Sequence, residues 1–135
     1  MSAKIVNLAE FLNGLKGDVR EVEETTSRIV RRFALGALRR LVLASPVDTG
    51  RFRGNWQITV GPEEAAGETG RTDRSGAATI AAGMQAISAQ RGFDRVVIVN
   101  NVEYGPDLNN GSSKQAPAGF VEAAIDAEMN LTAST

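Results

Sequence analysis

"SPVDTGRFRGNW" (Ser45 to Trp56) separates a long helical pattern from the first strand-like segment of the chain. Proline fixes its own φ angle and disfavours a helical conformation in the residue before it, so we expect the preceding helix to end here. Asp48, Thr49 and Gly50 are typical turn residues, because Asp can accept hydrogen bonds from nearby backbone amides and Gly permits a positive φ. The stretch therefore predicts a turn in which Asp48 accepts from the amide of Gly50 or Arg51.

The segments on either side of this turn carry clear periodic patterns. Before it, apolar residues recur with a period near 3.6 and Asp18 can cap them, which predicts one long helix over residues 18–44. After it, "NWQITV" predicts a strand over residues 55–61 that begins at a buried Trp56. Farther along, "DRVVIVNN" predicts a second strand over residues 94–101, whose continuous apolar run indicates burial on both faces.

The remaining segments predict shorter helices and one long loop. Apolar spacings of three and four predict helices over residues 77–90 and 117–130, and a short N-terminal helix over residues 5–18. Residues 62–76 are rich in Gly, Thr and charge without apolar periodicity, which predicts an exposed, mobile loop. The expected fold class is α+β, with a long N-terminal helix and two shorter helices packed on a small, mostly antiparallel sheet.

Composition limits the classes of protein to which the chain can belong. It has 135 residues, of which 42% are hydrophobic and 23% charged, as in an ordinary single globular domain over residues 1–135. No apolar run approaches the roughly 20 residues that cross a bilayer, and no secretory signal pattern opens the chain. Cysteine and histidine are absent, which excludes disulfides and thiolate metal sites and removes the commonest general base. We expect no membrane partner, no cofactor and no enzymatic activity.

Other candidate sites have weak support. "NNGSSK" at residues 109–114 lacks the spacing of a phosphate-binding loop, and a flexible polar loop is the simpler interpretation. The acids at positions 94, 103, 107 and 126 match no calcium or magnesium loop. Trp56 and Tyr104 could stack on a base or a sugar, but core and rim packing is the favoured interpretation.

Charge is unevenly distributed although the net charge is only −1. Residues 25–56 hold seven arginines and one acid, whereas residues 18–24 hold four acids and one arginine. On a helix Arg28, Arg32 and Arg39 fall near one stripe, which predicts a basic ridge opposite the apolar face, and two further arginines, Arg31 and Arg40, flank that stripe. The ridge could pair with Glu21, Glu23 and Glu24 of a neighbouring copy in a head-to-tail ring, or it could be a solvated face. Direct nucleic-acid binding is a minority interpretation, because no aromatic residues are interleaved with the arginines.

Three stretches in order, "SPVDTGRFRGNW", "VVIVNNVEYGPDLNNGSS" and "QAPAGFVEAAI", resemble a family of tailed-phage proteins. This family comprises the neck or tail-completion proteins of virion morphogenesis, with the layout "PVDTGxLRxxW … xNxxxYxxxxExGxSxxAPxGxV". By this resemblance, the turn motif contains Pro46, Val47, Asp48, Thr49, Gly50, Arg53 and Trp56. The strand-exit and loop motifs contain Asn100, Tyr104, Gly111, Ser113, Ala116, Pro117 and Gly119. Two positions depart from the layout, since Phe52 replaces Leu and Asn110 replaces an acid.

The resemblance implies a structural role in the virion, at the neck or top of the tail, after assembly in the host cytoplasm. The family forms homo-oligomeric rings, by analogy hexamers, between a head-closure (connector) protein and a tail-terminator or tail-tube protein. Genomic DNA passes through the bore. The turn motif would be architectural and would present Arg51 and Arg53 near neighbouring subunits or the lumen.

Two other classes of function remain open. One is a cytoplasmic nucleic-acid-binding module that uses the arginine-rich helix. The other is an enzyme, which is the weakest interpretation because the chain would have to rely on an acid pair or a lysine.

Overall fold

The computed structural model describes residues 2–5 and 19–133, with side chains from Glu23 to Thr132. Within these residues a three-stranded antiparallel sheet is formed by β1 (Ser2–Ile5), β2 (Trp56–Val60) and β3 (Val96–Asn100). The strand order is β1-β3-β2, so β3 is central and pairs with both neighbours. This central position explains why every residue of β3 is buried.

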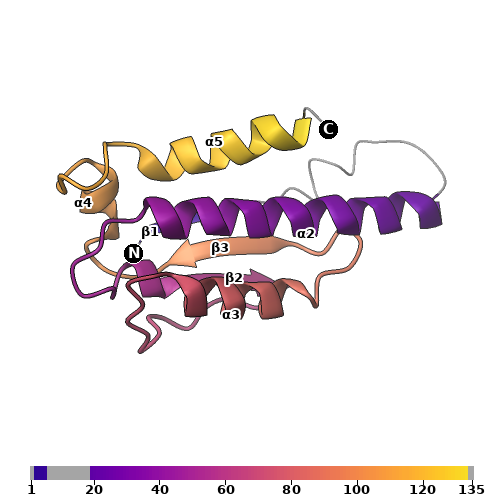
Figure 1. Cartoon of the computed structure of the whole chain (residues 1–135). Helices are drawn as coiled ribbons and strands as arrows, with labels where there is room; N and C mark the ends of the chain where they lie inside the picture. The colour runs from indigo at the N-terminus through magenta and orange to yellow at the C-terminus, as the bar shows by residue number, and fades with distance from the viewer. Residues whose placement is uncertain (1, 6–18, 134–135) are drawn as a thin grey trace.

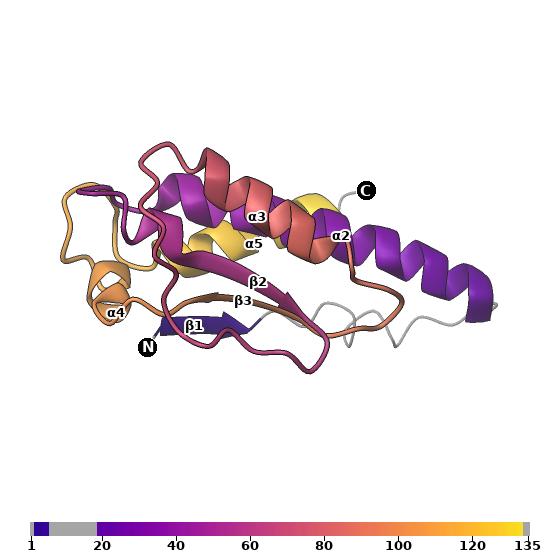
Figure 2. The ribbon, with the colours of Figure 1, turned by 90° about the horizontal axis from the view of Figure 1, so that it is seen from below.

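Three helices form a layer on one face of the sheet (Figure 1). The long helix α2 (Val19–Ala44) lies between α5 (Phe120–Ala133) and α3 (Ala77–Ile87), and α3 packs closely on β2. Figure 2 shows the sheet on one side of this helical layer. The arrangement is α+β, which confirms the fold class expected from the sequence.

The core lies between the helical layer and the sheet. Phe33, Leu38 and Leu41 of α2 are almost completely buried, as are Trp56 of β2 and Ile98 of β3. Burial of each such side chain contributes roughly 1.5–3 kcal/mol relative to exposure. The core therefore fixes which face of α2 points inward, and the opposite face lies at the surface of the fold.

Most predicted elements occur close to the expected bounds. The helix expected to extend to residue 90 ends at Ile87, and the chain continues in tight turns. The helix expected from residue 117 begins only at Phe120, because Gly119 adopts a φ of +79° that is incompatible with a helix.

Three differences concern short or weakly patterned segments. The expected helix over residues 5–18 lies outside the described residues, except that Ile5 belongs to β1. The four residues of β1 are too few to carry a strand pattern, and they form a strand by pairing with β3. A short helix, α4 (Gly105–Asn109), occurs where a loop was expected, because Pro106 presets the φ of a first helical turn. In the described part of the chain no helix is long and apolar enough to span a membrane.

Candidate functional site

The turn motif closes the C-terminal end of α2 through Arg53. Its guanidinium donates to the carbonyl oxygens of Leu43 (3.2 Å) and Ser45 (2.9 Å), which lie at or just beyond the last turn of α2. A third hydrogen bond reaches the carbonyl of Arg74 (2.8 Å). Carbonyls at a helix end have no partner within the helix, so Arg53 satisfies them and links the helix to a distant loop. Arg53 thus uses its guanidinium within its own chain, and its expected position near a neighbouring subunit or the lumen stays a prediction.

Aromatic residues anchor the motif to the core. Trp56 is 2% exposed, and its Nε1 donates to Ser45 Oγ (2.7 Å), which in turn donates to the carbonyl of Leu41 (2.6 Å). The ring of Phe52 lies between those of Trp56 (5.8 Å), Tyr104 (6.2 Å) and Phe120 (6.3 Å). The expectation of a buried Trp56 is confirmed. The Phe that replaces Leu at position 52 is the centre of this cluster.

Thr49, not Asp48, accepts the hydrogen bond within the turn. The amide of Arg51 donates to Thr49 Oγ1 (3.2 Å), while the exposed Asp48 side chain makes no hydrogen bond to any described residue. The predicted role of Asp48 is therefore wrong. Gly50 has a φ of +95°, and a Cβ there would lie 2.7 Å from the amide nitrogen of Asp73, so only glycine suits this position.

The loop over residues 62–76 is irregular, as expected, but its second half is bound tightly to the turn motif. Thr69 N donates to Asn55 Oδ1 (2.7 Å), and Arg71 Nε donates to the carbonyl of Gly54 (2.8 Å). Asp73 N donates to the carbonyl of Gly50 (3.0 Å). Each of these hydrogen bonds is polar and involves at least one backbone atom, so none of them leaves an apolar periodicity in the sequence. That is why the sequence predicted mobility and missed the attachment.

Asp73 also caps α3. Its carboxylate accepts from Gly76 N (3.0 Å), Thr79 N (2.8 Å) and Thr79 Oγ1 (2.7 Å). Burial raises the pKa of Asp73, but the hydrogen bonds from Thr79, Gly76 and Ser75 outweigh it and the net pKa is lowered. The carboxylate is therefore held in its charged form.

The strand-exit and loop motifs meet the turn motif at the same end of the fold. Asn100 is fully buried, donates from Nδ2 to the carbonyl of Phe52 (2.8 Å) and accepts from Val102 N (3.1 Å). Gln115 donates to the carbonyl of Val47 (2.7 Å) and accepts from its amide (2.8 Å), as a neighbouring strand would. The sequence pattern did not single out Gln115, because one exposed amide side chain carries no periodic signal.

The remaining loop-motif residues shape the approach to α5. Ser113 Oγ accepts from Gln115 N (3.1 Å), and Gly111 has a φ of +92° that favours glycine. Pro117 is exposed shortly before the helix begins. Asn109, which the sequence analysis also missed, caps α5 by accepting from Val121 N (3.0 Å).

A groove of about 460 Å³ lies where the three motifs meet. Its lining residues come from all three motifs and from α4: Pro46, Asp48, Thr49, Arg51, Phe52, Tyr104, Leu108, Ser113 and Gln115. Arg51 is engaged within the chain, with hydrogen bonds to both carboxylate oxygens of Glu68 (2.9 and 2.8 Å) and its guanidinium 5.4 Å from the centre of the Tyr104 ring. The hydrogen bonds to Glu68 raise the pKa of Arg51. One wall of the groove is thus already formed, and the charge of Arg51 in that wall is balanced by Glu68.

The two arginines expected on the flanks of the basic ridge are engaged within the chain, whereas the three on its stripe are exposed. Arg40 Nε pairs with the buried Glu128 of α5 (2.9 Å), and Arg31 Nε donates to the carbonyl of Gln90 (2.9 Å). Three others, Arg28, Arg32 and Arg39, are exposed and form no hydrogen bond or ion pair with the described residues. Of the five arginine side chains that the structure describes on α2, these three could meet a partner with an unbound guanidinium.

Neither metal chemistry nor similarity to known proteins adds to this site. No group of three acidic side chains that could hold a metal ion occurs among residues 23–132. No protein-family model, curated protein or solved structure matches the chain at a significant level. The resemblance carried by the three motifs therefore stays a prediction.

Proposed function

We propose that this protein is a structural component of the head–tail junction of a tailed phage, a neck or tail-completion ring that joins capsid and tail. The observation that carries the proposal is the convergence of the three family-like stretches. Trp56, Asn100 and Gln115 come from different stretches, yet each contributes a hydrogen bond or a buried ring to one end of the fold. Three chance matches would not be expected to build one shared structure. Their convergence therefore supports the resemblance to the phage family.

Two unlike exposed surfaces on α2 favour a head-to-tail contact between copies. Near its C-terminal end, α2 and α3 enclose an open groove of about 800 Å³ with the exposed apolar side chains Leu43 and Met84 and with Arg39. Roughly 30 Å away along the helix, Glu23 and Glu24 are exposed. A contact between different surfaces of identical chains generates a ring when the rotation closes. The side chain of Glu21, also expected to take part, lies outside the described residues.

The partners follow from this role. The ring, a hexamer by analogy, would contact a head-closure protein on one side and a tail-terminator or tail-tube protein on the other. The genome would pass through its bore, where unpaired arginines such as Arg28 and Arg32 could meet phosphates. The protein would be located in the virion after assembly in the host cytoplasm.

The proposal is tested with particles from a phage strain that lacks this protein. Electron microscopy should show filled heads and complete tails that are not joined, and the wild-type protein supplied in trans should restore joining. Supplying Met84→Asp should fail to restore joining. Contact between copies through the α2–α3 groove would bury the new carboxylate without a partner, which is costly. The control Met129→Asp alters a methionine on α5 of similar exposure (41%, against 49% for Met84) and should restore joining. Normal virions without the protein would refute the role.

The nucleic-acid-binding alternative rests on the three unpaired arginines of α2. A salt titration with the free protein separates the two functions. Binding through several phosphate contacts weakens steeply as salt rises, whereas a ring component needs little affinity for DNA before it assembles. Tight, strongly salt-dependent DNA binding by the isolated protein would favour the alternative.

A further inference from the structure

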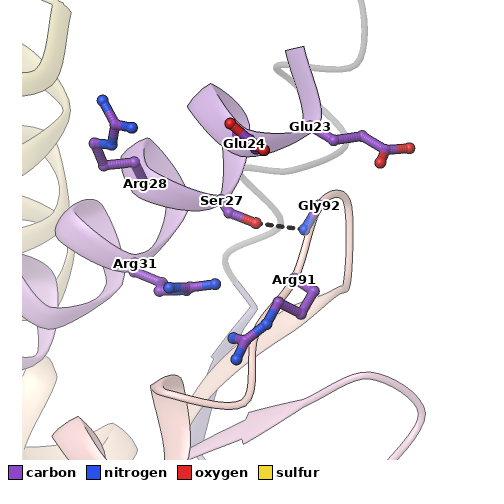
Figure 3. A pocket seen from close by; sticks show the side chains of 7 residues that line it. All are labelled: Glu23, Glu24, Ser27, Arg28, Arg31, Arg91 and Gly92. Atoms are coloured by element: carbon purple, nitrogen blue, oxygen red, sulfur yellow. Dashed lines mark hydrogen bonds between the residues drawn. The ribbon is translucent and has the colours of Figure 1, made fainter. Parts of the chain in front are cut away.

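Another pocket, of about 410 Å³, lies beside the N-terminal half of α2 and the loop that joins α3 to β3 (Figure 3). That loop is fastened to the helix. Gly92, with a φ of +50°, donates its amide hydrogen to Ser27 Oγ, and the fully buried Gln90 donates from Nε2 to the carbonyl of Gly92 (2.9 Å). Asp94 accepts from Arg91 N (3.2 Å). The backbone on this side of the pocket is therefore fixed.

Two arginines that line this pocket share one backbone carbonyl as a hydrogen-bond acceptor. Arg31 Nε and Arg91 Nη1 both donate to the carbonyl of Gln90, at 2.9 and 2.8 Å, and Arg91 Nη1 also donates to the carbonyl of Ser88 (2.7 Å). Figure 3 shows the two guanidinium groups pointing toward one another from α2 and from the loop. Neither forms an ion pair with a described acid. Two positive charges are thus held close together, and no acid among the described side chains pairs with either of them.

We propose that Arg31 and Arg91 form a binding site for one compact oxyanion of the phosphate type. A guanidinium is a planar fork of N–H donors that matches the oxygens of phosphate, and hydrogen bonds to ionised groups are about twice as strong as neutral ones. The shared carbonyl pre-orients both forks, so less conformational entropy is lost on binding. A bound anion would also remove the repulsion between the two cations.

The acids on the rim restrict what the site can accept. Glu23 and Glu24 line the same pocket, and Glu23 extends away from the two guanidinium groups (Figure 3). A long polyanion would have to run past these carboxylates, whereas a single phosphate would not. The site therefore suits an isolated phosphate group better than a continuous nucleic-acid backbone. This inference does not depend on the proposed role in the virion.

Titration with inorganic phosphate at constant ionic strength, followed by NMR of the backbone amides, tests the site. We expect saturable shifts at Arg91 and Gly92. Arg91→Gln should weaken binding about tenfold, the scale of one lost charge-assisted hydrogen bond. Arg91→Lys keeps the charge but loses the fork, and should also weaken binding. Arg32→Gln is the matched control, since it removes an exposed arginine next to Arg31 and should change the affinity less than about twofold.

Two further experiments test the effect of the rim acids and the source of the phosphate. The double variant Glu23→Gln/Glu24→Gln should bind phosphate more tightly, because two negative charges leave the rim. A short oligonucleotide at equal phosphate concentration should bind no more tightly than inorganic phosphate. Tighter oligonucleotide binding that Arg91→Gln abolishes would assign the same site to nucleic-acid phosphates. Equal losses in Arg91→Gln and Arg32→Gln, or no saturable binding of either probe, would overturn the proposal.

Discussion

The two ends of α2 use charged residues in opposite ways. At the C-terminal end, Arg53 and Arg51 are bonded within the chain, to carbonyls and to Glu68 respectively. In the N-terminal half, Arg31 and Arg91 are oriented by backbone carbonyls and pair with no acid that the structure describes, and Glu23 is exposed. The motif that looks most specific in the sequence thus builds the fold. The two arginines Arg31 and Arg91, by contrast, lie in segments where the sequence shows no motif.

The largest effect should follow from removing the aromatic anchor of the turn-motif end. Trp56→Ala deletes a 2% exposed ring and its hydrogen bond to Ser45, and should lower the free energy of unfolding by about 3–5 kcal/mol. Urea denaturation measures the loss. Phe93→Ala is the control at the other end, because this ring is 37% exposed and should contribute much less. Equal losses in the two variants would remove the contrast between an anchored end and an open one.

A smaller, pH-dependent effect should come from Asp73. Its pKa in the folded protein lies below the ordinary aspartate value of 3.8, so its contribution to stability is present above about pH 4. That contribution disappears as the pH falls through the lowered pKa. Asp73→Ala should cost about 1 kcal/mol at pH 7, the usual value of a helix cap, and the gap from wild type should close in strong acid. Thermal denaturation at several pH values measures it.

Asp94→Ala is the matched control at the open end. Its carboxylate accepts one longer hydrogen bond, from Arg91 N at 3.2 Å, so its removal should cost less than the removal of Asp73. A gap between Asp73→Ala and wild type that stayed constant down to pH 2 would show that the charge of Asp73 is not what stabilises α3.

How well the sequence predicted each end depended on the kind of signal available. The long helix was predicted from apolar periodicity and β3 from a continuous apolar run. Both signals report burial directly, and Phe33 and Ile98 are buried accordingly. The anchoring of residues 69–73 was missed because hydrogen bonds from Arg71 and Asp73 to backbone carbonyls impose no period on the sequence. β1 was missed for a related reason, since four residues at a sheet edge are too short for a pattern.

The candidate site was only partly predictable. Pro46 and Gly50 were assigned to the end of the helix and the turn from their backbone chemistry, and Trp56 was assigned to core packing. The positive φ of Gly50 and the buried ring agree with these assignments. The role of Asp48 was misassigned, because Asp and Thr can both accept a hydrogen bond in such a turn and only the backbone path decides between them. The sharing of Gln90 by Arg31 and Arg91 joins residues 60 positions apart, which no local pattern reveals.

The smallest effect on stability should come from the exposed arginines of α2, where function and folding separate most clearly. Replacing Arg28, Arg32 and Arg39 together with Gln keeps helix propensity and breaks no hydrogen bond to a described residue. The free energy of unfolding should stay within about 0.5 kcal/mol of wild type, as for other surface substitutions. Arg40→Gln, one position from Arg39, is the control: it leaves the buried Glu128 without its ion pair and should destabilise the protein measurably.

If the three arginines meet a neighbouring copy or DNA, particles that carry the triple variant should fail to join heads to tails even though the protein is folded. Normal titres would reduce these arginines to a solvated face, and the proposed role would then depend on the α2–α3 groove and the motif resemblance.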